Sequence, residues 1–142
     1  MNVKLSAEEM RYITLFESLT GASACDCLID EDGNKLTFVV KSGDIGRAIG
    51  KGGNNIQRVR RATGKNVEVI EHSDDPIEFL KNVFAPAKIE SINLIEQDGK
   101  KIALVAVERS SKGRAVGRRG KNIKRAKMLA ARHHRISDVS LT

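Results

Sequence analysis

Apolar residues recur at helical spacing near the start of the chain. The segment Ser6-x-x-Glu9 is typical of a capping box, and Gly21 is a residue type at which helices commonly end. Between these signals, the apolar positions are Ile13, Phe16 and Leu19. The pattern predicts a helix, and a second one begins near Asp75-Pro76, where a capping acid precedes a proline at the first helical position.

Strand-like segments follow each of these helices. The first pair covers residues 24–29 and 35–41, and the second pair covers residues 89–96 and 101–107. Turn residues separate the two members of each pair, including Asp-Gly dipeptides at residues 32–33 and 98–99. Two further segments, residues 67–70 and 136–141, each predict one more strand.

An internal repeat relates the two halves of the chain. Residues 46–58 read GRAIGKGGNNIQR and residues 113–125 read GRAVGRRGKNIKR, so eight of 13 positions are identical at an offset of 67 residues. In each copy, a glycine-rich loop separates two predicted helices. We therefore expect an α+β protein with two tandem domains, residues 1–72 and 73–142. Each should have the order α-β-β-α-α-β and a three-stranded sheet.

Basic residues are concentrated in the repeated segments. The net charge of +7 favours a polyanionic partner. Residues 46–65 contain six Lys and Arg, residues 112–135 contain ten, and neither segment contains Asp or Glu. All 18 acidic residues lie elsewhere, so the charge is segregated and does not read as an ordinary solvated surface.

Each repeat contains a Gly-x-x-Gly loop that opens a helix. Glycine allows a sharp turn and a close approach of another molecule. The free N–H groups and the dipole of the following helix favour an anion. Lys51 adds positive charge to the first loop, and Arg118 and Arg119 add it to the second. The spacing fits neither a P-loop nor a dinucleotide-binding fingerprint, so the loops do not predict a nucleotide-hydrolysing enzyme.

Both loops resemble the signature of KH domains. Residues 49–56 and 116–123 each read as an apolar residue, Gly-x-x-Gly, two further residues and Ile, and the element order resembles type II KH domains. The resemblance implies that each loop clamps the backbone of single-stranded RNA beside an apolar groove. The groove candidates are Ile49, Ile56, Val59, Val116, Ile123 and Ala126, with ordinary helix–sheet core as the alternative; for Ile56 and Ile123 the two alternatives are equally supported. With four Phe, one Tyr and no Trp, modules that stack bases on aromatic rings fit less well.

The residues that the resemblance assigns to RNA binding lie in the loops and in the helices that follow them. In the first domain they are Gly50, Lys51, Gly52, Gly53, Asn54, Ile56, Arg58 and Arg61. In the second domain they are Gly117, Arg118, Arg119, Gly120, Lys121, Ile123, Lys124 and Arg125. Because the second loop carries two arginines, we expect it to contribute more salt-dependent affinity. The first loop, with its additional glycine, should contribute more sequence discrimination.

The chain as a whole resembles the archaeal NusA-like transcription termination/elongation factors. This resemblance implies binding to nascent single-stranded RNA, with RNA polymerase as a second partner. The chain has no counterpart of the N-terminal polymerase-binding domain or the OB-type domain of bacterial NusA, so contacts made by those domains do not transfer. One alternative is an RNA-binding accessory factor in ribosome assembly or translation. Another, from a different class, is a protein-interaction module with a KH fold.

No residue pattern predicts catalysis, a cofactor or a metal site. Cys25 and Cys27 do not have the spacing of a zinc site or a disulfide framework, and we expect one buried and one partly exposed thiol on opposite strand faces. His72, His133 and His134 have no Cys or acidic partner at ligand spacing. With no signal peptide or membrane-spanning pattern, we expect a cytoplasmic, monomeric RNA-binding protein that is not an enzyme.

Overall fold

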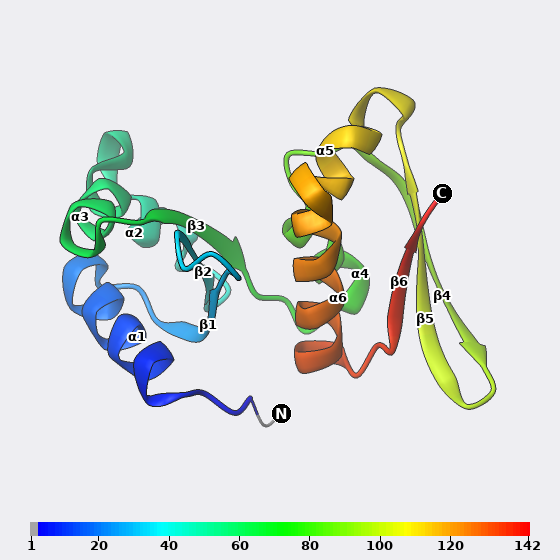
Figure 1. Ribbon diagram of the computed structural model, residues 1–142, viewed down its shortest axis with the longest axis horizontal. Coiled ribbons are helices and arrows are strands. Elements are labelled where there is room, and N and C mark those ends of the chain that lie inside the picture. Colours follow the sequence, from blue (N-terminus) through cyan, green and yellow to red (C-terminus); the bar gives the residue numbers. More distant parts are fainter. Residues whose placement is uncertain (1–2) are drawn as a thin grey trace. The chain divides into compact units, whose positions relative to one another are not determined.

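The computed structural model describes residues 3–142, which form two compact units (Figure 1). The first unit comprises Lys4–Ser73, and the second includes Asp74–Thr142. Each unit contains helices and one three-stranded sheet, so the expected α+β class with two related modules is confirmed. Within residues 3–142, no helix is long and apolar enough to cross a membrane.

The first unit has the predicted order of helices and strands. Its elements are α1 (Ala7–Thr20), β1 (Ala24–Ile29), β2 (Lys35–Val40), α2 (Ile45–Ile49), the 3₁₀ turn η1 (Lys51–Gly53), α3 (Asn54–Thr63) and β3 (Asn66–Glu71). Strand β2 is central, antiparallel to β1 and parallel to β3. A parallel pair needs a crossover connection, which α2 and α3 supply. Figure 1 shows the three helices gathered on one side of this sheet.

The second unit repeats this topology. Its elements are α4 (Pro76–Phe84), β4 (Ile89–Gln97), β5 (Lys100–Val107), η2 (Arg109–Ser111), α5 (Lys112–Val116), η3 (Arg118–Gly120), α6 (Lys121–His134) and β6 (Asp138–Leu141). Strand β5 is central, antiparallel to β4 and parallel to β6. Helices α5 and α6 provide the crossover, so each Gly-x-x-Gly loop occupies the same position in its unit.

The cores lie between the helices and the sheets. In the first unit, Phe16 of α1 stacks on Phe38 of β2 with a centroid distance of 4.2 Å, and both rings are fully buried. In the second unit, Phe79 of α4, Val105 of β5 and Leu129 of α6 are fully buried. Burying side chains of this size stabilises each unit by about 1.5–3 kcal/mol per residue. These cores hold the helices on both sides of each loop against a rigid sheet.

The predicted helix starts are confirmed in detail. The Glu9 N–H donates to the Ser6 hydroxyl at 3.1 Å, and the Ser6 N–H donates to the Glu9 carboxylate at 2.8 Å, which completes the capping box. The Asp75 carboxylate accepts the Ile77 N–H at 3.0 Å, with Pro76 at the first helical position. These caps satisfy N–H groups that have no partner inside the helix.

The last strand differs from its prediction. It begins at Asp138, whereas the sequence pattern placed its start at residue 136. Helix α6 continues to His134 and ends at Arg135, which adopts the left-handed conformation with φ of 54°. The sequence pattern did not mark the end of α6, because helices usually end at a left-handed Gly and this one ends at a left-handed Arg. Ile136 is fully buried, and its N–H donates to the Ala130 carbonyl at 3.2 Å, so this apolar residue closes the helix.

The two cysteines differ in exposure because β1 is irregular. Cys25 is exposed and Cys27 is fully buried. Residues two apart on a regular strand face the same side, so the expectation that the C-x-C spacing places the thiols on opposite faces was wrong. In the pairing with β2, Ala24 lies opposite Val40 and Asp26 opposite Val39, which leaves Cys25 as the extra residue of a bulge. The bulge therefore accounts for the difference between the two thiols.

Candidate nucleic-acid interface

The two Gly-x-x-Gly loops share one backbone conformation. The first glycine has φ of 76° and ψ of 171° at Gly50, and φ of 78° and ψ of 169° at Gly117. The third loop residue is left-handed in both units, with φ of 61° at Gly52 and 57° at Arg119. The middle residues differ in sequence, yet the backbone does not. The shape of the loop must therefore be set by residues that the two copies have in common.

Glycine is required at the first loop position by both conformation and space. A Cβ atom on Gly50 would lie 2.7 Å from Cγ of Asn55 and 2.8 Å from its backbone nitrogen. At Gly117, the corresponding distance to Cγ of Asn122 is 2.7 Å. At Gly52, by contrast, no neighbouring atom among the described residues lies within 4 Å of the Cβ position. Gly52 thus leaves open space in the first loop, although the backbone has the same conformation there as in the second loop.

Two asparagines close these loops, and they were not among the predicted site residues. Nδ2 of Asn55 donates to the backbone carbonyl of Arg47 at 2.8 Å. Nδ2 of Asn122 donates to the carbonyl of Arg114, also at 2.8 Å. Each bond joins the first turn of the helix after the loop to the short helix before it. The signal in the sequence was the identity of this asparagine in both repeats.

The helix that follows each loop begins without a side-chain cap. Gly53 is the N-cap of α3 and Gly120 is the N-cap of α6, and among the described residues no side chain accepts a hydrogen bond there. Neither helix has an acidic residue in its first turn. The positive end of each helix dipole is therefore not neutralised by the protein, which favours an anion at this position.

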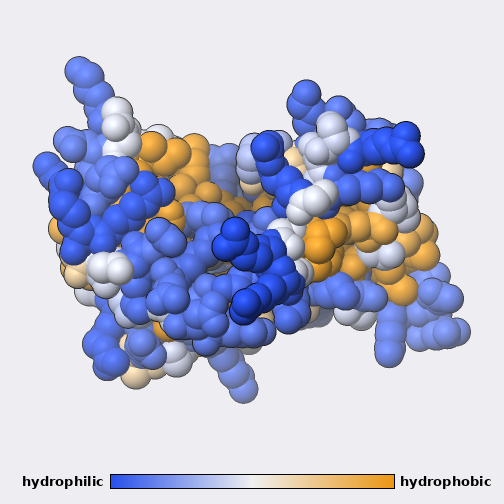
Figure 2. Space-filling model, turned by 45° about the horizontal axis from the view of Figure 1, so that its top comes forward, coloured by the Kyte–Doolittle hydropathy of each residue, from blue (hydrophilic) through white to orange (hydrophobic). Residues whose placement is uncertain are grey.

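The predicted RNA-binding residues fall into two groups by exposure. The exposed ones are Lys51, Gly52, Asn54, Arg58, Arg61, Arg118, Arg119 and Lys124. The half-buried ones are Gly50, Gly53, Ile56, Gly117, Gly120, Lys121, Ile123 and Arg125. Figure 2 shows one face of the molecule, where hydrophilic surface borders hydrophobic surface in both units.

The groove candidates separate into surface and core residues. Ile49 and Val116, directly before the loops, are 38% and 40% exposed, which is unusual for residues of this type. Val59 and Ala126 are fully buried, so they belong to the helix–sheet core and cannot line a groove. Each loop is therefore preceded by an apolar side chain that a base could cover.

Arg125 differs from its repeat partner Arg58. Nη2 of Arg125 donates to the Val83 carbonyl at 3.4 Å, near the end of α4, and the side chain is half-buried. A cation at a helix C-terminus is favoured by the helix dipole. Arg58 is exposed. The geometry therefore gives Arg125 a role inside its own unit, whereas Arg58 is available to a ligand.

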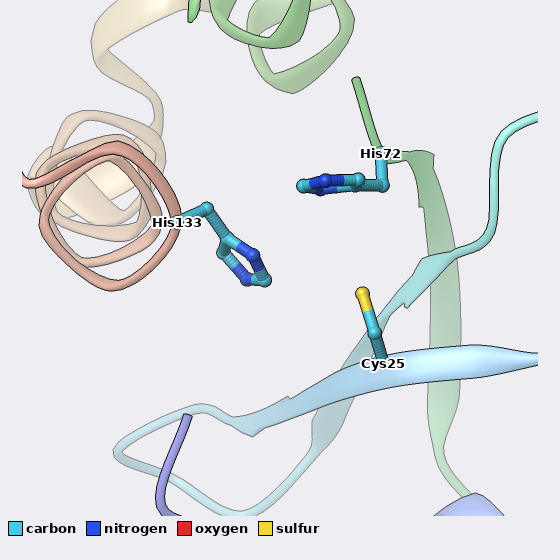
Figure 3. Close-up of side chains that lie close together, drawn as sticks. All are labelled: Cys25, His72 and His133. Carbon is cyan, nitrogen blue, oxygen red and sulfur yellow. The ribbon is translucent and has the colours of Figure 1, made fainter. Parts of the chain in front are cut away.

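Cys25 and His72 are neighbours in the first unit (Figure 3). The Cys25 sulfur and a ring nitrogen of His72 lie within 4.8 Å of each other. Although Cys25 is exposed as a residue, partial burial of its sulfur, followed by the nearby Asp26 carboxylate, raises the pKa of the thiol to about 11. The thiol is therefore protonated at neutral pH. Because a metal binds the thiolate, the raised pKa disfavours metal binding at this sulfur. Cys25 and His72 offer two ligand atoms within this unit, whereas zinc sites use three or four protein ligands.

Replacing Arg119 by Gly should stabilise the second unit while weakening its attraction for anions. A non-glycine residue in the left-handed region costs roughly 1 kcal/mol, and Arg119 has φ of 57°. We expect Arg119→Gly to raise the free energy of unfolding by about 0.5–1 kcal/mol, measured by urea denaturation. The exposed Arg118→Gly is the control and should not stabilise. A stability gain in both variants would show that the left-handed backbone is not the cause.

Comparisons with known proteins agree with this geometry. The KH domain family matches residues 10–99, and the NusA-like second KH domain matches residues 76–140. The probable transcription termination protein NusA of Methanococcus vannielii is 40% identical over 132 residues, which cover 93% of this chain and 75% of that protein. The chain belongs to the NusA-like family of KH-domain proteins.

Other NusA-like proteins match the chain along nearly its whole length. The probable transcription termination protein NusA of Halococcus morrhuae is 38% identical over 141 residues, which cover 99% of both chains. A solved structure, described as the crystal structure of APE1850, has a TM-score of 0.82 and 43% identity, and covers 97% of this chain and 100% of its own. The two family matches overlap between residues 76 and 99, so they do not define a boundary between domains.

Proposed function

We propose that this NusA-like protein binds single-stranded RNA through its two Gly-x-x-Gly loops and acts on nascent transcripts in termination or elongation. The observation that carries the proposal is the repeated loop. In both units, a loop of one shape places exposed cations at an uncapped helix N-terminus and beside an exposed apolar residue. Phosphate would bind the helix N-terminus and the cations, and the bases would lie toward Ile49 and Val116.

The contacts that we propose follow the exposed residues of each loop. Lys51 in the first unit, and Arg118 and Arg119 in the second, would pair with phosphates. Arg58 and Arg61 would border the RNA beyond the first loop, and Lys121 and Lys124 beyond the second. Ile56 and Ile123, half-buried after the loops, would form the floor of the base-binding surface. We assign these two sets to separate domains, residues 1–72 and 73–142.

The transcriptional role is supported by relatives that are named probable transcription termination proteins. As part of the proposal, RNA polymerase is a second partner. The protein works as a monomer in the cytoplasm, and its function is binding without catalysis. Co-purification with ribosomes or pre-ribosomal particles in place of polymerase would contradict the transcriptional role and favour ribosome assembly or translation.

The RNA-binding proposal is tested by fluorescence anisotropy across a salt series. We expect the protein to bind short single-stranded RNA more tightly than duplex RNA or single-stranded DNA. The log of affinity should fall with log salt by roughly 0.7 for each phosphate that is neutralised. Changing Arg118 and Arg119 to Gly should therefore reduce the slope by about 1.4, and Lys51→Gly by about 0.7. Equal slopes for both variants would contradict the predicted asymmetry, and no binding would contradict the function.

Sequence discrimination by the first loop stays a prediction. The loops have the same backbone conformation, but Gly52 leaves space where the second loop carries the Arg119 side chain. A base or sugar could approach the first loop more closely at this point. Binding to a randomised RNA pool, measured with each loop disabled in turn, should show stronger sequence preference when the first loop is intact.

A further inference from the structure

We infer that Asn55 and Asn122 are positioning residues that hold the two loops in the shape needed to receive phosphate. The expected effect of these asparagines on RNA affinity rests on the proposed RNA-binding function, whereas their effect on loop geometry does not. Neither side chain is assigned a contact with RNA. Each acts through the backbone of the loop that it closes.

The hydrogen bond of Asn55 replaces a bond that the chain geometry removes. Helix α2 spans only Ile45–Ile49, and carbonyls in the last turn of a helix lack donors from the helix itself. At Gly50, the backbone turns away, with ψ of 171°, so the helix cannot continue. Nδ2 of Asn55 then donates to the Arg47 carbonyl at 2.8 Å, eight residues earlier in the chain. One side chain thereby connects the end of α2 to the start of α3.

Gly50 and Asn55 form a single packed unit, which we call the Gly–Asn clasp. The missing side chain of Gly50 leaves space that Cγ and Cβ of Asn55 occupy, because a Cβ on Gly50 would be 2.7 Å and 2.9 Å from them. In the second unit, Gly117 and Asn122 form the same clasp, and Asn122 donates to the Arg114 carbonyl at 2.8 Å. Any residue with a side chain at the glycine position would occupy the space through which the asparagine reaches the carbonyl.

The comparison between the two units separates loop shape from loop chemistry. The residues between the glycines are Lys-Gly in the first unit and Arg-Arg in the second, yet the backbone angles agree within a few degrees. The clasp is identical in both units. One form of clasp thus accompanies one loop shape in both units, and the two middle residues determine which charges are presented to the ligand.

The benefit of a fixed loop is a smaller entropy loss on binding. A loop that is already ordered does not have to be immobilised when the phosphate arrives. Without the asparagine bond, the same N–H groups and cations would still be present, but the loop would sample other conformations. Loss of the clasp should therefore weaken affinity without changing the number of phosphates that are neutralised.

The experiment measures loop order and RNA affinity in the same variants. We expect Asn55→Ala to lower the ¹⁵N order parameters of the amides of residues 51–53. The dissociation constant for single-stranded RNA should rise about threefold to tenfold, with an unchanged salt slope. Asn122→Ala should have the same effects at residues 118–120. The matched controls Asn66→Ala and Asn93→Ala, at exposed strand positions, should change neither quantity.

A second variant separates positioning from a general loss of stability. Asn55→Asp keeps the size and shape of the side chain but removes the N–H donor, so the loop amides should become mobile while the β1–β3 amides stay ordered. Only the relaxation measurement is used for this variant, because its charge alters RNA affinity directly. Unchanged loop order in both Asn55 variants would overturn the inference. Equal loosening of loop and sheet would overturn it as well, since that result indicates a purely structural role.

The outcome is distinguishable from failure of the proposed function. If the native protein does not bind RNA, the proposed function fails, and the relaxation data still decide whether the clasp orders the loop. If the native protein binds RNA and the variants have mobile loops with unchanged affinity, the clasp does not act in binding, and the positioning role is rejected.

Discussion

Reversing the charge of both loops should lower the affinity for single-stranded RNA by more than about 100-fold. The variant combines Lys51→Asp and Gly52→Asp with Arg118→Asp and Arg119→Asp. It removes three cations and places four carboxylates where we propose that phosphate binds. An ion pair at a solvated site contributes about 1 kcal/mol, and 1.4 kcal/mol corresponds to a tenfold change in affinity. Fluorescence anisotropy at fixed salt measures the loss.

The backbone strain that Gly52→Asp adds should not disrupt the first loop, because the second loop already carries a non-glycine residue, Arg119, in the same left-handed conformation. Positions 52 and 119 are left-handed, a conformation that Asp adopts more readily than most residues, and they are exposed. The matched control for the second loop is Lys4→Asp with Arg11→Asp, which makes the same charge change at exposed positions near α1. We expect this control to bind RNA nearly as well as the native protein. If this control lost as much affinity as Arg118→Asp with Arg119→Asp alone, net charge, and not the loops, would control binding.

Replacing Gly50 by Ala should destabilise the first unit by about 2–4 kcal/mol. Strain at a glycine-only backbone conformation accounts for about 1–3 kcal/mol. Overpacking adds a further cost, because the new Cβ would meet Asn55 atoms at 2.7–2.9 Å, including its backbone nitrogen, which cannot move without shifting α3. Gly117→Ala should have a similar effect in the second unit. Urea denaturation followed by circular dichroism measures the change in the free energy of unfolding.

Gly46 and Gly113 provide matched controls within the same repeats. Both lie in the short helices before the loops, neither has a positive φ, and no neighbouring atom among the described residues lies within 4 Å of their Cβ positions. Alanine is favoured over glycine in a helix by about 0.5–1 kcal/mol, so Gly46→Ala should stabilise. If Gly46→Ala and Gly50→Ala changed stability equally, the steric account of the loop would be wrong.

The sequence was sufficient to predict most secondary structure because its signals are local. A capping box at Ser6, a capping acid before Pro76 and an Asp-Gly turn at residues 98–99 act through neighbouring backbone groups, and all three lie where expected. The repeat also located both Gly-x-x-Gly loops, since identical residues at an offset of 67 required the same structure twice. Boundaries were less certain where no local signal exists, as at the left-handed Arg135.

Roles that depend on distant neighbours could not be read from the sequence. Val59 and Ala126 looked like possible groove residues, but the sheet buries them completely. Arg125 and Arg58 occupy the same repeat position, but Arg125 is half-buried and donates to the Val83 carbonyl, whereas Arg58 is exposed. A pattern of residue types predicts which face of a helix is apolar, but it does not show which residues of the sheet or of another helix contact that face. These assignments therefore needed the tertiary structure.

The sequence by itself determined the two-module α+β organisation, the two basic Gly-x-x-Gly loops and the segregation of charge. These features depend on residue identity and on contacts between close neighbours along the chain. Only the tertiary structure decided that both loops have one shape, that Gly50 and Gly117 are required by close packing, and that Asn55 and Asn122 close the loops. Such facts depend on atoms separated by five to eight residues, which approach one another only after the backbone turns at the glycine.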